Sequence, residues 1–264
     1  MFCGIAAMDR IVNAFTFAFA SSLTRYLLFA GAAYLFFYVF CRRVLLHRKI
    51  QKCFPNNTDY LREIIYSLTT CVVFGIVGGI IFSPWVRPHT FIYFKIEERG
   101  WLYFVGSIPV MVFVHDAYFY WTHRLLHWKP VFRTVHAVHH RSNNPSPWAA
   151  LSFHPLEAIV QAGLFIVLAF MIPVHPMALL IFFLWTTFSN VVGHLGFEIF
   201  PRSLTESRWG RWLNSSTNHN IHHQKPNGNY GLFFRFWDEW MGTTHDGYHD
   251  LLRKVQSQMP RKNT

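Results

Sequence analysis

Residues 135–140 read VHAVHH and residues 218–223 read NHNIHH, so the string H-x-x-H-H occurs twice in one chain. A single copy could arise by chance, but two copies with the same internal spacing call for a common cause. A third group, HRLLH, precedes them at residues 123–127. On a helix, positions i, i+3 and i+4 share one face, so each group is expected to present its imidazoles toward a common point. We interpret the three groups as histidine boxes of a metal site.

The boxes supply more nitrogen ligands than one metal ion needs. They contain His123, His127, His136, His139, His140, His219, His222 and His223. Neutral imidazole is the commonest protein ligand for metals and suits iron, zinc and copper. A tetrahedral zinc site takes only four ligands. Two adjacent metals, each with an open position, therefore fit the number better. Three other histidines, His47, His89 and His175, lack ligand spacing and are expected to be solvated or interfacial.

The composition indicates a membrane protein. The chain has 264 residues, of which 52% are hydrophobic and 14% are charged, whereas soluble domains contain about 25% charged residues. The net charge of +11 comes from residues that flank apolar segments, which favours lipid headgroups and membrane topology over nucleic acid as the reason for it. The four cysteines show no C-x-x-C spacing, so neither a disulfide framework nor a thiolate metal site is indicated.

Several apolar stretches are long enough to enter a bilayer. Three are expected to span it, at residues 21–41, 64–82 and 101–120. A fourth stretch, residues 158–190, is broken by Pro173 and Pro176. Each half is short for a full span, so we expect a helical hairpin that enters and returns on the same side. Residues 1–23 are expected to form an interfacial or short membrane helix.

The basic residues predict which side of the membrane the boxes occupy. The first span is followed by Arg42, Arg43, Arg48, Lys49 and Lys52. Because Lys and Arg accumulate in cytoplasmic loops, this end of the span is expected in the cytoplasm. The second span then exits, the third returns near Thr122, and the hairpin brings the chain back before the last box. The predicted fold is an all-α, multi-pass transmembrane bundle of about four spanning or hairpin helices, with a cytosolic helical cap carrying the histidine boxes.

The chain shows no Gly/Ser run or Pro-rich tract that would act as a linker. We therefore expect a single integral-membrane domain over residues 1–264. Within it, residues 1–105 are expected to form N-terminal membrane helices, residues 106–247 a histidine-box catalytic core, and residues 248–264 a basic tail.

The three boxes, in this order between apolar spans, resemble those of the fatty acid hydroxylase/sterol desaturase superfamily of integral-membrane di-iron enzymes. The resemblance covers roughly residues 106–247 and includes SPWAALSFHPLEA after the second box, GHLGFEIFP before the third and FFRFWDEWMGT after it. It implies an O2-dependent membrane di-iron oxidoreductase that hydroxylates or desaturates a lipid of the sterol, sphingolipid or fatty acyl class. The alternative is a His-rich membrane transporter or binding protein for zinc or iron, which would place polar residues in mid-span.

The resemblance also implies further site residues. His194, in GHLGFE, matches a metal-binding histidine between the second and third boxes. Some members carry another histidine four residues earlier, where this chain has Asn190. The metal coordination position of that histidine would therefore be filled here by the amide, filled by water, or left open. His154, in SFHPLE, is expected as a ligand, a hydrogen-bonding support or a helix cap. His115 is expected to be structural or to support a ligand, with Asp116 as a partner for an imidazole N–H.

The expected cofactors are two iron ions, with O2 as co-substrate. Electrons are expected from a separate ferredoxin, reductase or b-type cytochrome, because the sequence contains no Rossmann fingerprint or C-x-x-C-H haem attachment. The lipid is expected to enter from the bilayer between apolar walls that include Tyr118, Trp121, Trp148 and Phe153. A bacterial inner membrane and the endoplasmic reticulum both fit, with the active site on the cytoplasmic side.

Overall fold

One long helix opens the chain in the computed structural model, which describes the backbone of residues 2–258 and the side chains of residues 7–258. Helix α1, Phe2–Tyr34, continues into a π-helical segment, Leu35–Phe40. The expectation of a separate helix over residues 1–23 is wrong for the described part of that stretch. The Arg25 guanidinium donates to the Ser21 hydroxyl one turn earlier, so this charge is accommodated within a continuous helix instead of ending it.

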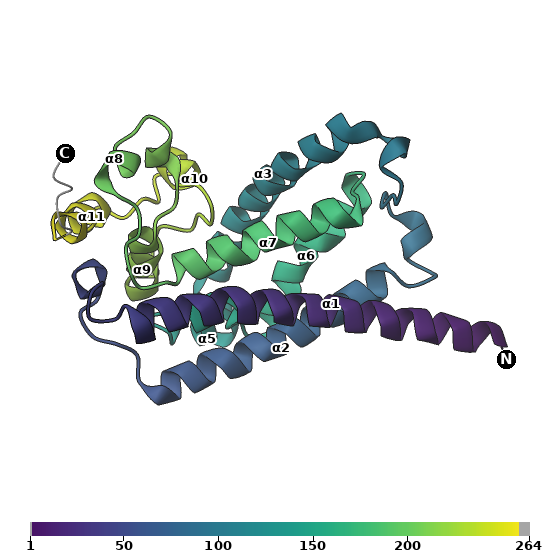
Figure 1. Ribbon diagram of the computed structural model, residues 1–264, viewed down its shortest axis with the longest axis horizontal. Coiled ribbons are helices and arrows are strands. Elements are labelled where there is room, and N and C mark those ends of the chain that lie inside the picture. Colours follow the sequence, from purple (N-terminus) through teal and green to yellow (C-terminus); the bar gives the residue numbers. More distant parts are fainter. Residues whose placement is uncertain (1, 259–264) are drawn as a thin grey trace.

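Helix α2, Asn57–Ile81, packs along α1 (Figure 1). It begins at an Asn56 cap, whose side chain accepts the amide of Asp59. The two helices approach closely where α2 carries glycine: a Cβ added at Gly78 would lie 2.5 Å from the Cβ of Ala18. Small residues at such contacts let membrane helices pack backbone against backbone.

The histidine end of the bundle is reached by three further helices. Helix α3, Gly100–Leu126, extends beyond the predicted end of its span and carries the first box in its last turn. Helices α6, Pro155–Met171, and α7, Pro176–Gly193, form the predicted hairpin. Each begins with proline directly after a capping histidine. Proline is well tolerated at the first helical position, because the amide hydrogen that it lacks would have no partner within the helix.

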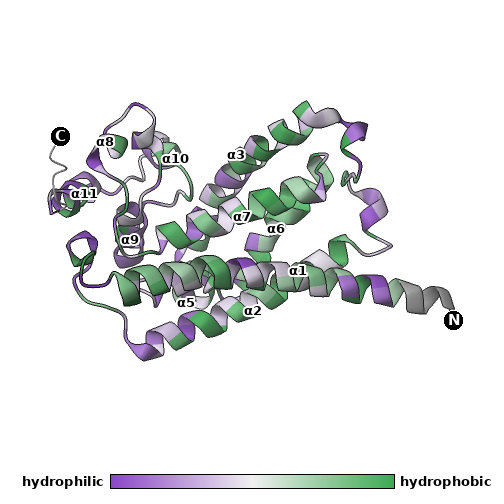
Figure 2. Ribbon diagram, in the orientation of Figure 1, coloured by the Kyte–Doolittle hydropathy of each residue, from purple (hydrophilic) through white to green (hydrophobic). Residues whose placement is uncertain are grey.

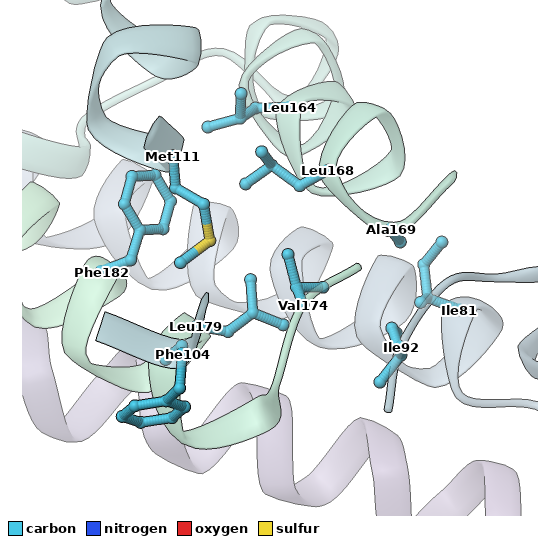
Figure 3. Close-up of a cluster of buried hydrophobic side chains, with 11 residues drawn as sticks. Ile81, Ile92, Phe104, Met111, Leu164, Leu168, Ala169, Val174, Leu179 and Phe182 are labelled. Atoms are coloured by element: carbon cyan, nitrogen blue, oxygen red, sulfur yellow. The ribbon is translucent and has the colours of Figure 1, made fainter. Parts of the chain in front are cut away.

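Within the described part of the chain, four helical segments are long and apolar enough to cross a membrane, and α6 is a shorter apolar helix. The four are Ala7–Phe40, α2, α3 and α7. Residues 2–258 contain no β-strand, only isolated bridges, and Figure 2 shows apolar residues along all five of these helices. The buried cluster in Figure 3 joins α3, α6 and α7, with Met111, Leu168 and Phe182 fully enclosed. The prediction of an all-α multi-pass bundle is confirmed.

Shorter elements surround the histidine end of the bundle. They are α4 (Lys129–Val131), a π-helical turn (Phe132–His136), α5 (Ala137–His140), a 3-10 turn (Pro147–Leu151), α8 (Arg202–Thr205), α9 (Ser216–Gln224), α10 (Phe236–Trp240) and α11 (Tyr248–Ser257). The basic segment after α1 is joined to this end, because the Glu198 amide donates to the Arg48 carbonyl at 2.9 Å and the Ile50 amide to the Gly196 carbonyl at 3.1 Å.

Candidate metal centre

Nine histidines gather at this end of the bundle in two groups, and within each group the candidate ligand atoms lie within 4.8 Å of one another. Cluster A consists of His123, His127, His136, His140 and His222; cluster B consists of His139, His194, His219 and His223. All eight box histidines and His194 are therefore brought together from α3, the 132–140 segment, the end of α7, and α9.

The members of one box do not all face one point. In each H-x-x-H-H string, the pair spaced i, i+4 enters one cluster and the histidine at i+3 enters the other. Thus His136 and His140 belong to cluster A while His139 belongs to cluster B, and the third box divides in the opposite sense. The expectation of a common point is confirmed for the first box, whose His123 and His127 both enter cluster A. It is wrong for the two H-x-x-H-H strings, because adjacent helical residues diverge by roughly 100°. The doubled string links the two clusters.

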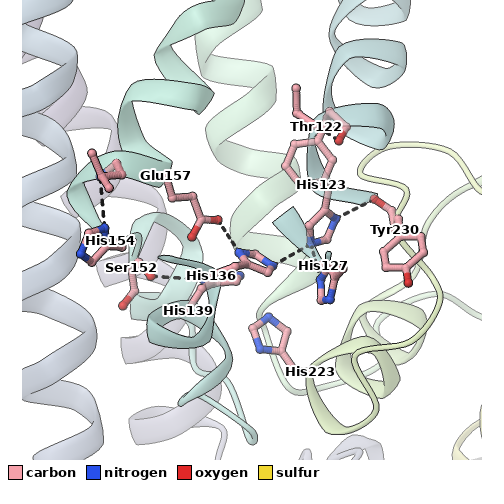
Figure 4. A network of polar contacts seen from close by, with 12 residues as sticks. Thr122, His123, His127, His136, His139, Ser152, His154, Glu157, His223 and Tyr230 are labelled. Atoms are coloured by element: carbon pink, nitrogen blue, oxygen red, sulfur yellow. Dashed lines mark hydrogen bonds and ion pairs between the residues drawn. The ribbon is translucent and has the colours of Figure 1, made fainter. Parts of the chain in front are cut away.

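Five of the nine imidazoles have their Nδ1 atoms held by an acceptor. The pairs are His123 with the Tyr230 carbonyl at 2.8 Å, His136 with Glu157 Oε1 at 2.8 Å, His139 with the Ser152 carbonyl at 3.2 Å, His194 with the Asn190 carbonyl at 2.8 Å, and His222 with the Gly228 carbonyl at 2.7 Å. Figure 4 shows several of these contacts. A carbonyl only accepts, so the Nδ1 atoms of His123, His139, His194 and His222 carry the hydrogen, and their Nε2 atoms present a lone pair. His136 has the same tautomer when the Glu157 carboxylate is ionised.

These tautomers bring lone pairs face to face. The Nε2 atoms of His123 and His136 lie 3.1 Å apart in cluster A, and those of His139 and His194 lie 3.2 Å apart in cluster B. Two unprotonated nitrogens at this distance repel each other unless a cation lies between them. Two nitrogens bound at right angles to one metal at about 2.1 Å would be about 3.0 Å apart, so the spacing suits metal ligation.

Burial keeps the imidazoles neutral. Desolvation lowers the pKa of His194 to about 4, although its hydrogen bond to the Asn190 carbonyl acts in the opposite direction. The pKa values of His139 and His223 are also lowered, first by burial and then by nearby histidines. The Nε2 atoms of His140 and His222 are buried without a hydrogen-bond partner. Neutral, desolvated nitrogens without partners fit the ligand set that a divalent metal requires.

Two residues considered as ligands hold other positions. His154 lies outside both clusters, and its Nδ1 accepts the amide of Leu156 at 3.2 Å, which caps α6. The Asn190 side chain donates to the Ala150 carbonyl at 2.7 Å, while its own carbonyl holds His194. Asn190 thus supports a clustered histidine through its backbone.

The expected pairing of Asp116 with an imidazole is wrong. Its carboxylate accepts the amides of Phe233 and Phe234 and so anchors the loop after α9. His115 is buried among aromatic rings, including that of Phe182, and its Nδ1 has no partner. Of the other histidines, His47, His89, His175, His245 and His249 also lie outside the clusters.

An apolar cavity of about 630 Å³ lies between α1, α2, α3, α6 and α7. Phe119 and Phe153 line its inner end. The Phe119 ring lies 4.8 Å from that of His123 in cluster A, and the Phe153 ring lies 5.1 Å from that of His139 in cluster B. The cavity therefore ends beside both clusters.

Of the aromatic residues expected as substrate walls, only Phe153 is among the residues that line this cavity. Trp121 is 48% exposed and packs beside Trp237. Trp148 packs against Tyr26, and the Tyr118 hydroxyl donates to the Val160 carbonyl at 2.6 Å.

Buried carboxylates that the sequence did not single out position the histidines. Glu157 is fully buried and accepts from His136. Glu198 accepts the amide and hydroxyl of Thr217 at the start of α9. Asp238 accepts the amide of Tyr230, whose carbonyl holds His123. The sequence did contain an indication of these three carboxylates, because each lies in a mostly apolar stretch, where ionisable residues usually have a function.

Comparison with known proteins agrees with this site. The sequence model of the fatty acid hydroxylase family matches residues 108–243. A Delta(7)-sterol 5(6)-desaturase of Gibberella zeae is 29% identical over 234 residues, which cover 86% of this chain and 69% of the relative. Lathosterol oxidase of Mus musculus is 26% identical, covering 84% of this chain and 72% of the relative. None of the solved structures matches this chain. The matched segment, over half of the chain, includes both histidine clusters, and the chain belongs to the fatty acid hydroxylase/sterol desaturase superfamily.

Proposed function

We propose that this protein is an O2-dependent membrane oxidoreductase that holds two iron ions and hydroxylates or desaturates a lipid. The observation that carries the proposal is the pair of lone-pair contacts, one in each cluster, between imidazoles whose tautomers are set by carbonyl or carboxylate acceptors. Family membership supports iron over zinc, and the apolar cavity that ends beside both clusters supports a lipid substrate.

In this proposal, the clustered histidines hold one ion in each cluster through their inward-facing nitrogens. Iron bound there would supply reductive activation of O2 and removal of hydrogen from an unactivated C–H bond. The chain holds the ligands in place: Glu157 accepts the Nδ1 hydrogen of His136, and the carbonyls of Tyr230 and Asn190 do the same for His123 and His194. Such supporting contacts raise ligand basicity and set ring orientation.

The cavity supplies the route for the substrate. Phe119 and Phe153 would guide a hydrocarbon between the two clusters and exclude water from the reacting carbon. The named substrates of the relatives are sterols, Delta(7)-sterol for one and lathosterol for another. For this chain we propose the broader class, a lipid with an aliphatic or alicyclic C–H bond.

We further propose that the site faces the cytoplasm and takes electrons from a separate carrier. The basic segment after α1 supports the orientation, because it hydrogen-bonds to the histidine end: the Gln51 amide donates to Asn220 at 3.1 Å. Since Lys and Arg concentrate on the cytoplasmic side, this contact supports a cytoplasmic position for the histidine end. The transporter alternative has less support, because the clusters gather at helix ends and not along a path through the spans.

The test is metal analysis and lipid profiling of the purified full chain and of His222→Ala. Wild type is expected to contain two irons per chain and to yield a lipid richer by one oxygen or poorer by two hydrogens. His222→Ala is expected to lose metal and product while still inserting into the membrane. His89→Ala, an exposed histidine outside the clusters, is the matched control. Full metal and activity in His222→Ala would refute the assignment of cluster A.

A further inference from the structure

Two basic side chains of α1 interrupt the largely apolar lining of the cavity, the exposed Arg10 near the helix start and the partly buried Arg25 in its second half. Arg25 lines the cavity together with Ser21 and Ser22, and it lies inside a segment long enough to span the membrane. Its guanidinium donates to the hydroxyls of both serines. No carboxylate among the described residues forms an ion pair with it, and its Nε is buried without a partner.

This charge needs a counter-charge that the protein does not provide. A guanidinium in a membrane span is costly unless it is paired. Arginine carries only donors; because both serine oxygens already accept from it, their own hydroxyl hydrogens are free to donate. The group at Arg25, Ser21 and Ser22 therefore offers donors without a matching acceptor, which is the complement of an anionic oxygen headgroup.

Other polar nitrogens line the same cavity. The Arg25 guanidinium carbon lies 5.3 Å from the centre of the Phe183 ring, and His115 contacts the adjacent Phe182 at 5.6 Å between ring centres. Gln161, on the facing helix α6, also lines the cavity. The side-chain nitrogen of Gln161 and the Nδ1 of His115 are both buried without partners, so α3 and α6 add unpaired polar groups to a lining that is otherwise largely apolar.

The distance from the neighbours of Arg25 to the clusters follows from residue counts along α7 and α3. Along α7, Phe183 precedes His194 by eleven residues, or roughly 16 Å at 1.5 Å per residue. Along α3, His115 precedes His123 by eight residues, or roughly 12 Å. An extended alkyl chain advances about 1.3 Å per carbon–carbon bond, so roughly ten bonds cover this gap.

We propose that Arg25, with Ser21 and Ser22, binds the carboxylate of an extended lipid acid whose hydrocarbon chain runs along the cavity, so that a carbon roughly ten bonds from the carboxylate reaches the histidine clusters. The binding site rests on the cavity and its polar groups, and the reacting position rests on the function proposed above. The subsite would select an acid of the fatty acyl class over a neutral lipid.

A sterol anchored by its hydroxyl does not fit this geometry. Carbons 5 and 6, which are named for the Gibberella zeae relative, lie two and three bonds from the hydroxyl-bearing carbon of a sterol. With the hydroxyl at Arg25, they would remain about 10 Å short of the clusters. With the hydroxyl at the clusters, the aliphatic side chain would lie against the unpaired guanidinium. The carboxylate of an extended lipid acid would pair with the charge of Arg25, and its alkyl chain would cover the distance from Arg25 to the clusters.

The test is displacement of the fluorescent fatty acid cis-parinaric acid from the full chain, purified with its metal in detergent. Palmitate, hexadecanol and methyl palmitate serve as competitors of equal chain length. Wild type is expected to bind palmitate roughly 10- to 100-fold more tightly than the other two, the effect of one charge-assisted contact. Arg25→Met is expected to lose this preference, and Arg25→Lys is expected to keep part of it. Arg42→Met, outside the cavity and exposed, should match wild type.

Equal displacement by all three competitors in the wild type would overturn the subsite without any variant, so the result does not depend on Arg25→Met folding. Retention of the full palmitate preference by folded Arg25→Met would overturn it as well. The binding result is separate from catalysis. Palmitate selectivity without metal or product would support the subsite and refute the proposed function. Metal and product without palmitate selectivity would support the proposed function and refute the subsite.

Discussion

Among single residues, Glu157 supports a clustered histidine directly without being a member of either cluster. It is fully buried and its carboxylate accepts the Nδ1 hydrogen of His136 at 2.8 Å. This contact sets which nitrogen of His136 faces cluster A. A buried carboxylate that holds an imidazole in this way also makes the imidazole a stronger ligand.

Replacing Glu157 should therefore weaken metal binding without removing a ligand. Glu157→Ala is expected to lower the affinity of cluster A for iron by roughly 10- to 100-fold. Glu157→Gln keeps an acceptor but not the charge, and it should fall between Ala and wild type. Titration with a competing chelator measures both. Glu206→Gln, which removes an exposed ion pair with Arg202, is the matched control; wild-type affinity in Glu157→Ala would contradict the role.

Individual helices contribute through close packing and through where they end. α1 and α2 approach at Gly78, where a Cβ would lie 2.5 Å from that of Ala18. Neither of these two Cβ atoms could move without its backbone, because neither belongs to a flexible side chain. α3 and α7 end in His127 and His194 as C-caps, so their lengths bring these imidazoles to the level of the clusters.

The glycine contact gives a prediction on stability. Gly78→Ala should force α1 and α2 apart and destabilise the fold by about 1–3 kcal/mol, the usual cost of overpacking. Thermal unfolding in detergent measures the change in Tm. Gly106→Ala, on α3, is the control because no heavy atom lies within 4 Å of its added Cβ; it should leave Tm unchanged or raise it. An unchanged Tm for Gly78→Ala would show that the helices accommodate the methyl group.

For the molecule as a whole, the clusters join segments that are distant in the chain. Cluster B alone connects the 132–140 segment, the end of α7 and α9 through His139, His194 and His219. A ligand that binds only the folded state stabilises it, so bound metal would hold these segments together. Without metal, the facing lone pairs would repel one another.

Removal of metal should therefore destabilise the whole bundle. Treatment of the purified protein with a chelator at pH 8 is expected to lower Tm by more than about 5 °C, and added ferrous ion should restore it. Acid should lower the stability of the metal-free protein further. Burial lowers the pKa of His194 to about 4, against about 6.5 in the unfolded chain. The unfolded state thus binds more protons between these values, and stability falls as the pH drops from 6.5 toward 4. A Tm independent of chelator would contradict a structural role for the metal.

Much of this architecture could be predicted from the sequence, because it depends on local properties. Apolar length predicted the helices, Pro173 and Pro176 predicted the break in the hairpin, and histidine spacing singled out eight of the nine residues that the fold gathers. The ninth, His194, came from the family resemblance. What local patterns could not reveal is which cluster each imidazole enters, because that depends on how each helix is rotated against its neighbours. The link from Glu157 to His136 and the cavity at Arg25 arise where separate helices meet. Only the tertiary structure determines these contacts, because they join side chains that no spacing along the chain relates.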